Sequence, residues 1–534
     1  GMADAYDEHF KRGCSAAEEE KYGEAAACFD RALAERPGDR QATYYKGRAI
    51  AGLGRHAEAV WHYDRALGSP ATDPVVSFHK AVSLAEMDRH EEAIACYDAA
   101  LRARPGDDHM LFYKGRALAA TGRHEEAVAC YDAALEASPG HPNPLYAKGR
   151  SLVMMGRHRD AVECFDGVLA TQPGDYHVLY AKGLVFGEMG MNWEAIGCLD
   201  GALRARPGDD RALVNKGLAL ARLEQYKEAI SCFDGALKTE PGNPQILLNK
   251  GDALAEMDRH KEAMACFEMS LRAEPGSYLA HRSRGRSLEA TGRREEALSS
   301  FDMALEARPG DRYSLLYKGA ILAEMERHGE AVSCFDAVLS SRPGDYHSLH
   351  RRGVSLAKME RHEEALASFE AALTERPGDH NVLFNKGNSL ASLERHEEAA
   401  ACFDRVLEGS PDDDYALAYK GRSLSKLGRH EEAMECFGAA LERSPGNSDA
   451  RLEMADSLAD QERHEEAMEC FDGVIRSEPG NLRALYGKGI LLARLRRHRD
   501  AIACYDRMLE LDPGNRYVIT SKDLSMRMLD LGSG

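Results

Sequence analysis

Twelve of the thirteen cysteines in this 534-residue chain recur at multiples of 34 residues, and so do eleven of its 21 histidines. Thiolates and imidazoles bind metals such as zinc, and paired thiols form disulfides. Adjacent glutamates also recur, as in Glu125–Glu126 and Glu363–Glu364, and paired carboxylates can act as general acid and base. Which of these chemistries is possible depends on the elements that carry the residues.

The dipeptide Pro-Gly sets the spacing of those elements. It recurs from Pro37 to Pro513, with every gap equal to 34 residues or a multiple of it. Pro411 fills one missing place with Asp after it, and Pro70 fills the other, one residue early. The unit therefore occurs fifteen times, over residues 6–515, and residues 516–534 form a tail. We call each unit a repeat and number its positions from 1 to 34, with Tyr6 at position 1 of repeat 1.

Each repeat predicts two helices. Apolar residues at positions 4, 8 and 11 predict a first helix over about positions 2–14, and those at 20, 21, 24, 27 and 28 a second helix. Asp at position 34, such as Asp39, can cap the next first helix, and Pro-Gly ends each second helix. Gly at position 8 and Ala at position 20 allow close backbone approach, and Phe or Tyr at position 24 fills the space beside it. One helix pair is too small to fold alone, so the repeats must stack into an all-α solenoid.

Composition excludes several classes of function. The net charge of −19 argues against a broad phosphate-binding surface, so we expect no nucleic-acid partner. Apolar runs are too short for a membrane span, and the start GMADAYDEHFKRG lacks the features of a secretory signal. Gly1 ahead of Met2 resembles a tag scar, and residues 1–5 precede the first repeat. An odd number of cysteines without an export signal favours a reducing compartment, so we expect a cytoplasmic protein.

The pattern of Gly at 8, Ala at 20, an aromatic at 24, a small residue at 27 and Pro at 32 resembles the tetratricopeptide repeat (TPR). The resemblance covers residues 6–515 and implies a right-handed superhelix whose first helices line a concave groove. It also implies a protein-interaction role without catalysis. The chain departs from the family at position 7, where Lys or Arg replaces an apolar residue, as in Lys46 and Lys114. Such a stem can pack while its ammonium reaches water.

The repeat spacing assigns the recurring chemical groups to packing. Cysteines at position 23 of neighbouring repeats should lie about 10 Å apart, whereas a disulfide needs Cα atoms within about 7 Å. The histidines at position 17 are equally separated, so a shared metal is not expected. The glutamates at 18 and 19 suit the first turn of a helix, where they face water. We find no phosphate-binding or nucleophile motif, so we expect no catalysis, no metal and no cofactor.

The inward positions of the first helices vary most, and they predict a partner site. Aromatics occupy position 5 in the first six repeats, and Arg occupies position 9 of three of them, one helical turn away. Aromatic and Arg side chains favour interface hot spots, so we expect a peptide with acidic and apolar side chains there. The alternative is that these aromatics pack between adjacent first helices. The candidate residues are Phe10, Tyr44, Arg48, Phe78, Phe112, Arg116, Tyr146, Arg150 and Tyr180.

Asn215, Asn249 and Asn385 at position 6 resemble the asparagine ladders by which some TPR superhelices hold a peptide backbone, because an amide donates and accepts at once. The family's carboxylate clamp, Lys at 5 with Asn at 9, occurs in none of the repeats. The breaks at Gly68–Val76 and Gly187–Leu199 either change the local curvature or are neutral.

We therefore expect a monomeric scaffold or adaptor that binds a protein or peptide, with no membrane partner. The amphipathic segment Arg516–Leu529 is expected to cover the last repeat. Two alternatives stay open. The uniform repeats favour a structural solenoid that associates with itself, and a regulatory subunit of a separate enzyme is also compatible with the sequence.

Overall fold

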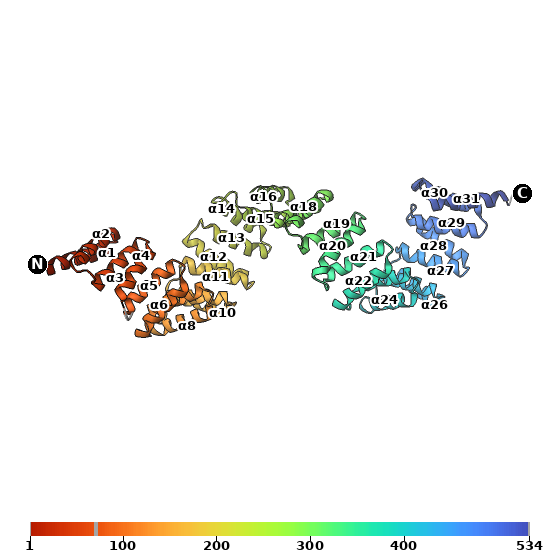
Figure 1. Cartoon of the computed structure of the whole chain (residues 1–534). Coiled ribbons are helices and arrows are strands. Elements are labelled where there is room, and N and C mark those ends of the chain that lie inside the picture. The colour runs from red at the N-terminus through yellow and green to blue at the C-terminus, as the bar shows by residue number, and fades with distance from the viewer. Residues whose placement is uncertain (1, 69–72, 532–534) are drawn as a thin grey trace. The chain divides into compact units, whose positions relative to one another are not determined.

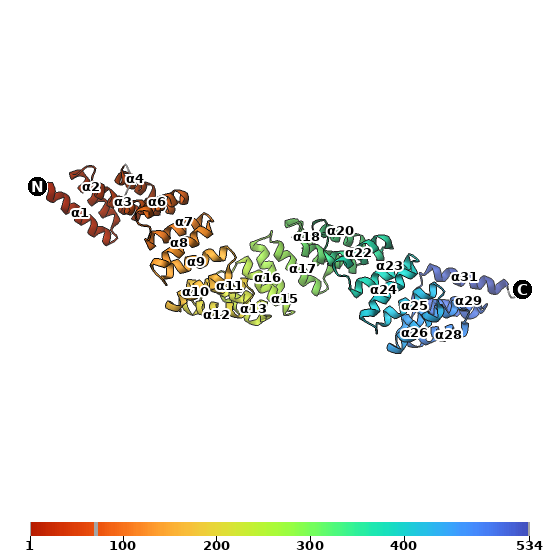
Figure 2. The same ribbon diagram turned by 90° about the horizontal axis from the view of Figure 1, so that it is seen from below.

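The structure is a computed structural model that describes residues 2–68 and 73–531; Gly1 with its expected tag scar, the early Pro70 and the last three residues of the tail lie outside the described residues. Within the described ranges the chain contains 31 α-helices and no strand, which confirms the all-α solenoid. The chain forms two compact parts, Gly1–Glu274 and Pro275–Gly534. In each part the helices stack in chain order, each first helix beside the second helix of its own repeat (Figures 1 and 2).

In the first part, the first helices are α1 (Met2–Glu18), α3 (Arg40–Gly52), α5 (Pro74–Glu86), α7 (Asp108–Ala120), α9 (Pro142–Met154), α11 (Tyr176–Glu188), α13 (Asp210–Arg222) and α15 (Pro244–Glu256). The second helices are α2 (Tyr22–Glu35), α4 (His56–Leu67), α6 (His90–Ala103), α8 (His124–Ala137), α10 (His158–Thr171), α12 (Asn192–Ala205), α14 (Tyr226–Leu237) and α16 (His260–Ala273).

In the second part, the first helices are α17 (Tyr278–Ala290), α19 (Arg312–Glu324), α21 (Tyr346–Lys358), α23 (His380–Ser392), α25 (Asp414–Lys426), α27 (Ser448–Asp460), α29 (Leu482–Arg494) and α31 (Arg516–Leu531). The second helices are α18 (Arg294–Ala307), α20 (His328–Ser341), α22 (His362–Glu375), α24 (His396–Gly409), α26 (His430–Arg443), α28 (His464–Ser477) and α30 (His498–Leu511).

Local sequence fixes where these helices begin and end. Asp39 at position 34 caps α3, because its Oδ1 accepts a hydrogen bond from the Ala42 backbone N–H at 2.8 Å, as predicted. Each first helix is followed at position 15 by a residue whose backbone has the left-handed conformation. Glycine adopts this conformation without steric cost, as at Gly428 (φ 77°), whereas Glu360 (φ 60°) is held in it by the surrounding turn. Pro-Gly follows most of the second helices, and the chain reverses there.

The core confirms the predicted close approach of the two helices in a repeat. A Cβ atom on Gly353 would lie 2.5 Å from Cε1 of Phe369, which is closer than real Cβ contacts. Ala365 at position 20 and Phe369 at position 24 are both fully buried. Glycine at position 8 therefore lets the aromatic ring of the second helix rest on the backbone of the first.

Lysine at position 7 joins one repeat to the next. The Lys114 side chain stays 24% exposed, and its Nζ lies 2.6 Å from Oδ1 of Asp98, at position 25 of the preceding repeat. The same pair recurs along both parts, for instance between Lys420 and Asp404. In repeats 13 and 14 both members are replaced together, by Gly438 and Met454.

The two ends of the described chain differ from the interior repeats. The first helix of repeat 1 was expected near position 2, but α1 already begins at Met2, because Met and Ala favour helix and Pro-Gly is missing ahead of it. At the other end, α31 packs on α30 and buries Val518. None of the described helices is long and apolar enough to cross a bilayer.

Candidate peptide-binding surface

The position 5 aromatics of the first part rest on the aromatic ring at position 24 of their own repeat. Tyr180, whose repeat has Leu199 there, instead stacks on Tyr176 with ring centroids 5.8 Å apart. These contacts place one edge of each ring in the core. The ring-centroid distances are 5.7 Å for Phe10–Phe29, 6.1 Å for Tyr44–Tyr63, 5.9 Å for Phe78–Tyr97, 6.2 Å for Phe112–Tyr131 and 5.9 Å for Tyr146–Phe165.

Several of the same aromatics also reach position 6 of the following repeat. The Tyr44 hydroxyl lies 3.0 Å from Nδ1 of His79, and Phe78 meets Tyr113 edge to face at 5.4 Å. Tyr44 and Phe78 are buried, whereas the other four candidate aromatics are half-buried. Packing between first helices therefore uses all or part of each ring, and only the half-buried rings present an edge on the surface.

The three candidate arginines are exposed beside these rings. The guanidinium carbon of Arg116 lies 5.9 Å from the ring centre of Phe112 and 5.5 Å from that of Tyr113. In the described part of the chain, neither Arg48 nor Arg116 nor Arg150 forms an ion pair with a carboxylate. Their charges face solvent unneutralised, and such cations attract an anionic ligand.

Buried tyrosine hydroxyls lie behind the arginines. Burial raises the pKa of Tyr131 to about 12, and the nearby Arg116 and Arg150 oppose that rise. The same two guanidinium groups therefore act on one neutral hydroxyl. Arg48 has a comparable place near Tyr44, where it opposes the rise in the pKa of that phenol caused by burial.

Several arginines on the first helices of the second part are, by contrast, paired with acids. Arg282 donates to Asp311 at 3.2 Å, and Arg483 donates to Glu453 at 2.8 Å and to Asp456 at 3.0 Å. These arginines are already neutralised within the chain. At position 9 of the second part, Arg422 also lies near an acid, 3.7 Å from Glu453.

The three candidate asparagines do not form one ladder. Asn215 donates its amide to the Tyr180 hydroxyl at 3.2 Å and to the Arg211 carbonyl at 2.8 Å. Asn249 accepts from Gln245 Nε2 at 3.2 Å. Asn385 lies in the second part, 3.2 Å from Nε2 of His350. Within the first part only Asn215 and Asn249 belong to the same surface.

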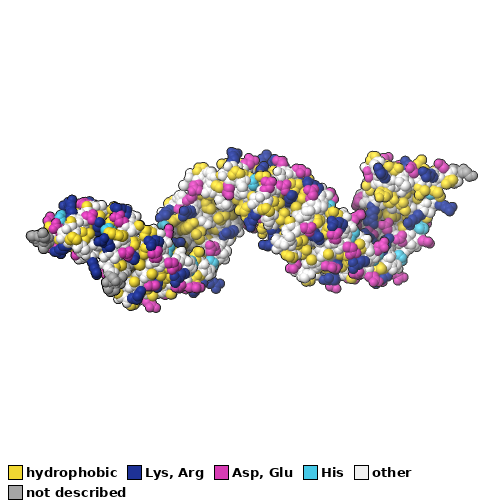
Figure 3. All heavy atoms as spheres, viewed as in Figure 1, with side chains coloured by type: hydrophobic (Ala, Val, Ile, Leu, Met, Phe, Trp, Pro, Cys, Tyr) yellow, Lys and Arg dark blue, Asp and Glu magenta, His cyan; other side chains and the backbone are white. Residues whose placement is uncertain are grey.

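The side chains on the surface of the first part change in type along the chain. Acidic and basic side chains are intermingled on the face that Figure 3 shows, whereas hydrophobic side chains gather in a hollow near α11 and α13. Leu184 and Leu218 occupy position 9 there, in place of the arginines of earlier repeats, and both are half-buried. The first-helix face thus passes from a cationic end to an apolar end.

The cysteines and histidines are placed as packing groups. All thirteen thiols are free, and burial raises the pKa of those at position 23 such as Cys130 and Cys164. Nδ1 of several position 17 histidines, including His362, is buried without a hydrogen-bond partner. Among the described residues no three His, Cys, Asp or Glu side chains converge as metal ligands would.

Sequence reasoning missed the pairing of position 7 with position 25 of the preceding repeat. The available signal was their joint change, since the only repeat with Met at position 7 follows the only repeat with Gly at position 25. These pairs lie on the second-helix side, away from the arginines of the candidate surface.

We compared the chain with models of known protein families. A family model described as "Tetratricopeptide repeat" matches most of the chain, and a second model with the same description matches two further segments. Curated protein sequences yield no match. The first model matches residues 10–74, 79–142, 187–244, 214–278, 248–312, 282–346, 318–380, 350–414, 384–448 and 452–516, and the second matches residues 118–183 and 424–478.

Three solved structures of different length are among those to which the chain is similar. A tetratricopeptide repeat protein from Parabacteroides merdae ATCC 43184 is 18% identical, over 47% of this chain and 98% of its own, with a TM-score of 0.38. MamA from Desulfovibrio magneticus RS-1 is 27% identical, over 32% of this chain and 98% of its own, with a TM-score of 0.31. The structure of Naa15/Naa10 bound to HypK-THB is 13% identical, over 99% of this chain and 97% of its own, with a TM-score of 0.36.

Proposed function

Because the chain belongs to the tetratricopeptide repeat family, we propose that it is a protein-interaction scaffold that binds an acidic and apolar segment of a partner protein on the first-helix face of its first part. The fold is typical of protein–protein interaction scaffolds and the family is generally non-catalytic. Within that class, the residues of the first part decide which partner chemistry is favoured.

The observation that carries the proposal is the set of three unpaired arginines, Arg48, Arg116 and Arg150, beside buried or half-buried aromatic rings. An acidic side chain of the partner would form charge-assisted hydrogen bonds with these guanidinium groups. An apolar stretch of the same segment would follow over Leu184 and Leu218. A partner with that order of side chains gains from both ends of the surface.

The test replaces the three arginines together by Ala and compares the proteins captured from a source lysate, identified by mass spectrometry. The matched control replaces Arg31, Arg102 and Arg204, which are exposed on second helices and carry the same total charge. We expect partners with acidic segments to be lost with the first triple variant and kept with the control. Equal recovery with both variants, at unchanged helical circular dichroism, would contradict the proposal.

Self-association is the second candidate, because α31 leaves large apolar side chains exposed. Tyr517 is 83% exposed and Leu524 is 61% exposed. Light scattering of the full chain decides between the two: a stable closed dimer favours self-association, and a monomer that captures a partner favours the scaffold. Replacing these apolar side chains by Tyr517→Ser and Leu524→Ser should dissociate such a dimer into monomers.

A further inference from the structure

Two of the fifteen repeats share a sequence that the others lack, Arg-His-Arg-Asp-Ala. It occurs at 157–161 in repeat 5 and at 497–501 in repeat 15, so that one copy lies in each part of the chain. Position 19 is Asp only in these two repeats, Asp160 and Asp500, and the other thirteen carry Glu. The change shortens the acidic side chain by one methylene.

The shorter acid changes the ion pair at the start of the second helix. In a regular repeat, Arg123 donates from Nε to Oε1 of Glu126 at 2.8 Å and from Nη2 to Oε2 at 2.7 Å, so both oxygens are used. Arg157 instead places Nε at 2.7 Å and Nη2 at 2.6 Å from one oxygen, Oδ2 of Asp160. Arg497 does the same with Oδ2 of Asp500, at 2.9 and 2.7 Å.

A cavity lies beside each of these two pairs. The first, of about 360 Å³, is bounded by α8, α9 and α10, and the second, of about 440 Å³, by α28, α29 and α30. The same nine repeat positions line both, and eight of them carry the same or a similar residue in the two cavities. These eight are Val128, Asp132, Leu145, Lys148, Leu152, Arg157, Asp160 and Cys164 in the first cavity, and Met468, Asp472, Leu485, Lys488, Leu492, Arg497, Asp500 and Cys504 in the second.

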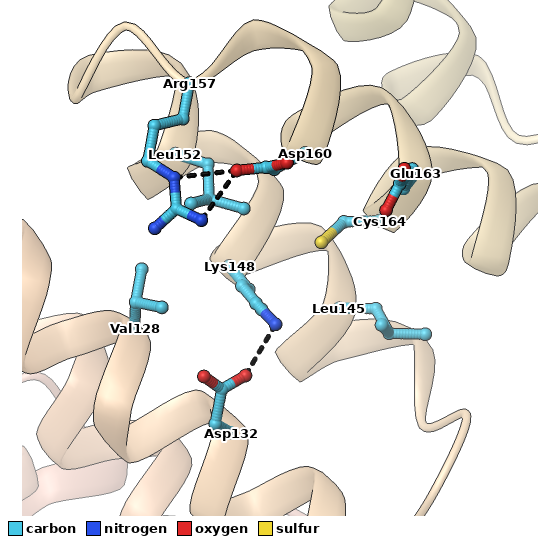
Figure 4. A pocket seen from close by; sticks show the side chains of 9 residues that line it. All are labelled: Val128, Asp132, Leu145, Lys148, Leu152, Arg157, Asp160, Glu163 and Cys164. Carbon is cyan, nitrogen blue, oxygen red and sulfur yellow. Dashed lines mark hydrogen bonds and ion pairs between the residues drawn. The ribbon is translucent and has the colours of Figure 1, made fainter.

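Each cavity combines an apolar wall with a Lys and an Arg, each of which is paired with an aspartate that lines the same cavity. Figure 4 shows Lys148 extending toward Asp132 and Arg157 paired with Asp160, with Val128 to one side of them and Leu145 to the other. Lys148 contacts Asp132 through Nζ at 2.6 Å. An ammonium has three N–H donors and a guanidinium five, so one carboxylate apiece leaves donors on both groups unused. The Nη1 amino group of Arg157 is among them, since the pair with Asp160 uses Nε and Nη2.

We infer that each cavity binds a small carboxylate with an aliphatic body, such as the C-terminal residue of a leucine-ending peptide. The carboxylate lies between the Lys and Arg side chains, and the aliphatic body lies on the apolar wall. Charge complementarity with the unused donors selects the anion, and a volume of this size suits one small ligand. In the regular repeats the longer Glu meets the same Nε and Nη2 donors through two separate oxygens, so the shorter Asp changes the space beside the arginine and not the number of its free donors.

These cavities are distinct from the candidate peptide-binding surface. They are lined by positions 4, 7 and 11 of a first helix and by residues of two second helices, whereas the candidate surface uses positions 5, 6 and 9. Their occupation is therefore independent of the proposed scaffold function, and either can fail without the other.

The two cavities should differ in affinity. The first also contains Glu163, whose charge repels a carboxylate. At the equivalent position the second contains Ala503, and Arg507 adds a further cation. The cavity of repeat 15 is thus expected to bind the carboxylate more tightly than that of repeat 5.

Equilibrium dialysis of the full chain with radiolabelled N-acetyl-leucine tests the inference, with N-acetyl-leucinamide as the uncharged competitor. We expect two sites per chain and competition by the amide that is weaker by about tenfold or more. Arg497→Ala should remove the tighter site and Arg157→Ala the weaker one. The matched Arg123→Ala, in a regular repeat, should leave both sites. Failure of the carboxylate to saturate the chain, equal competition by the amide, or loss of a site in Arg123→Ala would overturn the inference.

Conservative variants test the role of the shorter acid without changing the charge. Asp160→Glu and Asp500→Glu convert the pairs into those of a regular repeat, and each should remove one site. Glu126→Asp should add a third site in repeat 4, where Lys114 and Asp98 stand in place of Lys148 and Asp132. A stoichiometry of two in all three variants, at unchanged circular dichroism, would contradict the proposed role of aspartate.

Discussion

Lys522 on α31 lies 2.6 Å from Asp506 on α30, in the same contact that Lys488 on α29 makes with Asp472 on α28. The tail helix therefore takes the place of the first helix of a sixteenth repeat. Val518 follows the same register, since it is buried against Met508 of the preceding second helix. The cover of the last repeat thus repeats the contacts of the interior.

Truncation after Asn515 should destabilise the end of the second part. It exposes the wall on which Val518 packs, a loss of about 1.5–3 kcal/mol for one buried aliphatic side chain. Because each repeat of a solenoid contacts only its neighbours, amide hydrogen exchange should accelerate in α29 and α30 and stay unchanged in α21. The single change Lys522→Ala, which breaks a partly exposed pair, should cost at most about 1 kcal/mol. Unchanged protection of α30 after truncation would rule out this role of the tail.

The repeat period determined most of the fold in advance. Strict recurrence of Gly at position 8, Ala at 20 and an aromatic at 24 predicts both helices and their close approach, because small residues and a ring at those spacings leave one way to pack. The partner of Lys114 was not predictable in the same way. Asp98 lies on another repeat, and its distance from the ammonium depends on how successive repeats stack.

For the candidate surface, the sequence predicted the residues but not whether each of them is accessible to a partner. An aromatic at position 5 serves equally well as an anchor for a peptide and as a filler between first helices. Only the spacing of the helices reveals that Tyr44 is buried against His79, while Phe112 keeps an exposed edge beside Arg116. Unpaired arginines were also invisible in the sequence, since acidic residues are abundant throughout and pairing depends on their positions in space.

In most repeats the aromatic ring at position 24 rests on the glycine at position 8, but the ring of Phe471 does not. This difference gives a second prediction. Its repeat has Ala455 at position 8, and its ring lies instead against Gly487 of the next repeat, where an added Cβ atom would be 2.5 Å from Cε1. Gly487→Ala should therefore overpack the core, at about 1–3 kcal/mol, offset by about 1 kcal/mol of improved helix propensity. We expect a net lowering of the urea midpoint.

Two variants make that prediction specific. Ala455→Gly in the same chain should restore part of the lost stability, because it gives the ring of Phe471 the space used in other repeats. Gly480→Ala is the matched control, since its added Cβ atom would approach nothing closer than Leu511 at 3.7 Å. A loss of stability in the control equal to that of Gly487→Ala would remove the steric explanation.

The turn between the two helices of a repeat supplies a third prediction. Glu360 has φ of 60° at position 15, where Gly428 has φ of 77°. A side chain in the left-handed region costs about 1–2 kcal/mol, and glycine loses more chain entropy on folding by about 0.5–1 kcal/mol. Glu360→Gly should thus raise the urea midpoint and Gly428→Glu lower it, each by a change of about 0.5–1 kcal/mol in the free energy of unfolding. Shifts in the same direction for both variants would contradict this account.

Asp311 gives the fourth prediction, on acid stability. It is buried and caps α19, accepting from the Ser314 backbone N–H at 2.9 Å and from the Ser314 hydroxyl at 2.7 Å, with Arg282 at 3.2 Å. Burial alone would raise the pKa of this carboxyl, but the bonds from Ser314 and the charge of Arg282 outweigh it, so the pKa is lowered. A carboxyl whose pKa is lower in the folded state stabilises fully above its unfolded pKa of about 3.9. That stability is lost as pH falls through the folded pKa.

Asp311→Asn keeps an oxygen for the helix cap but loses the charge. We expect it to destabilise the second part near neutral pH and to lose less stability than the parent between about pH 4 and pH 2, measured as urea midpoints across that range. Asp345 provides an independent copy, because it accepts from the Ser348 backbone N–H at 3.0 Å and from Arg312 Nε at 2.8 Å, and its pKa is lowered as well. Asp345→Asn should behave in the same way. If both variants lost stability with acid as steeply as the parent chain, the charge of these caps would have no part in its acid sensitivity.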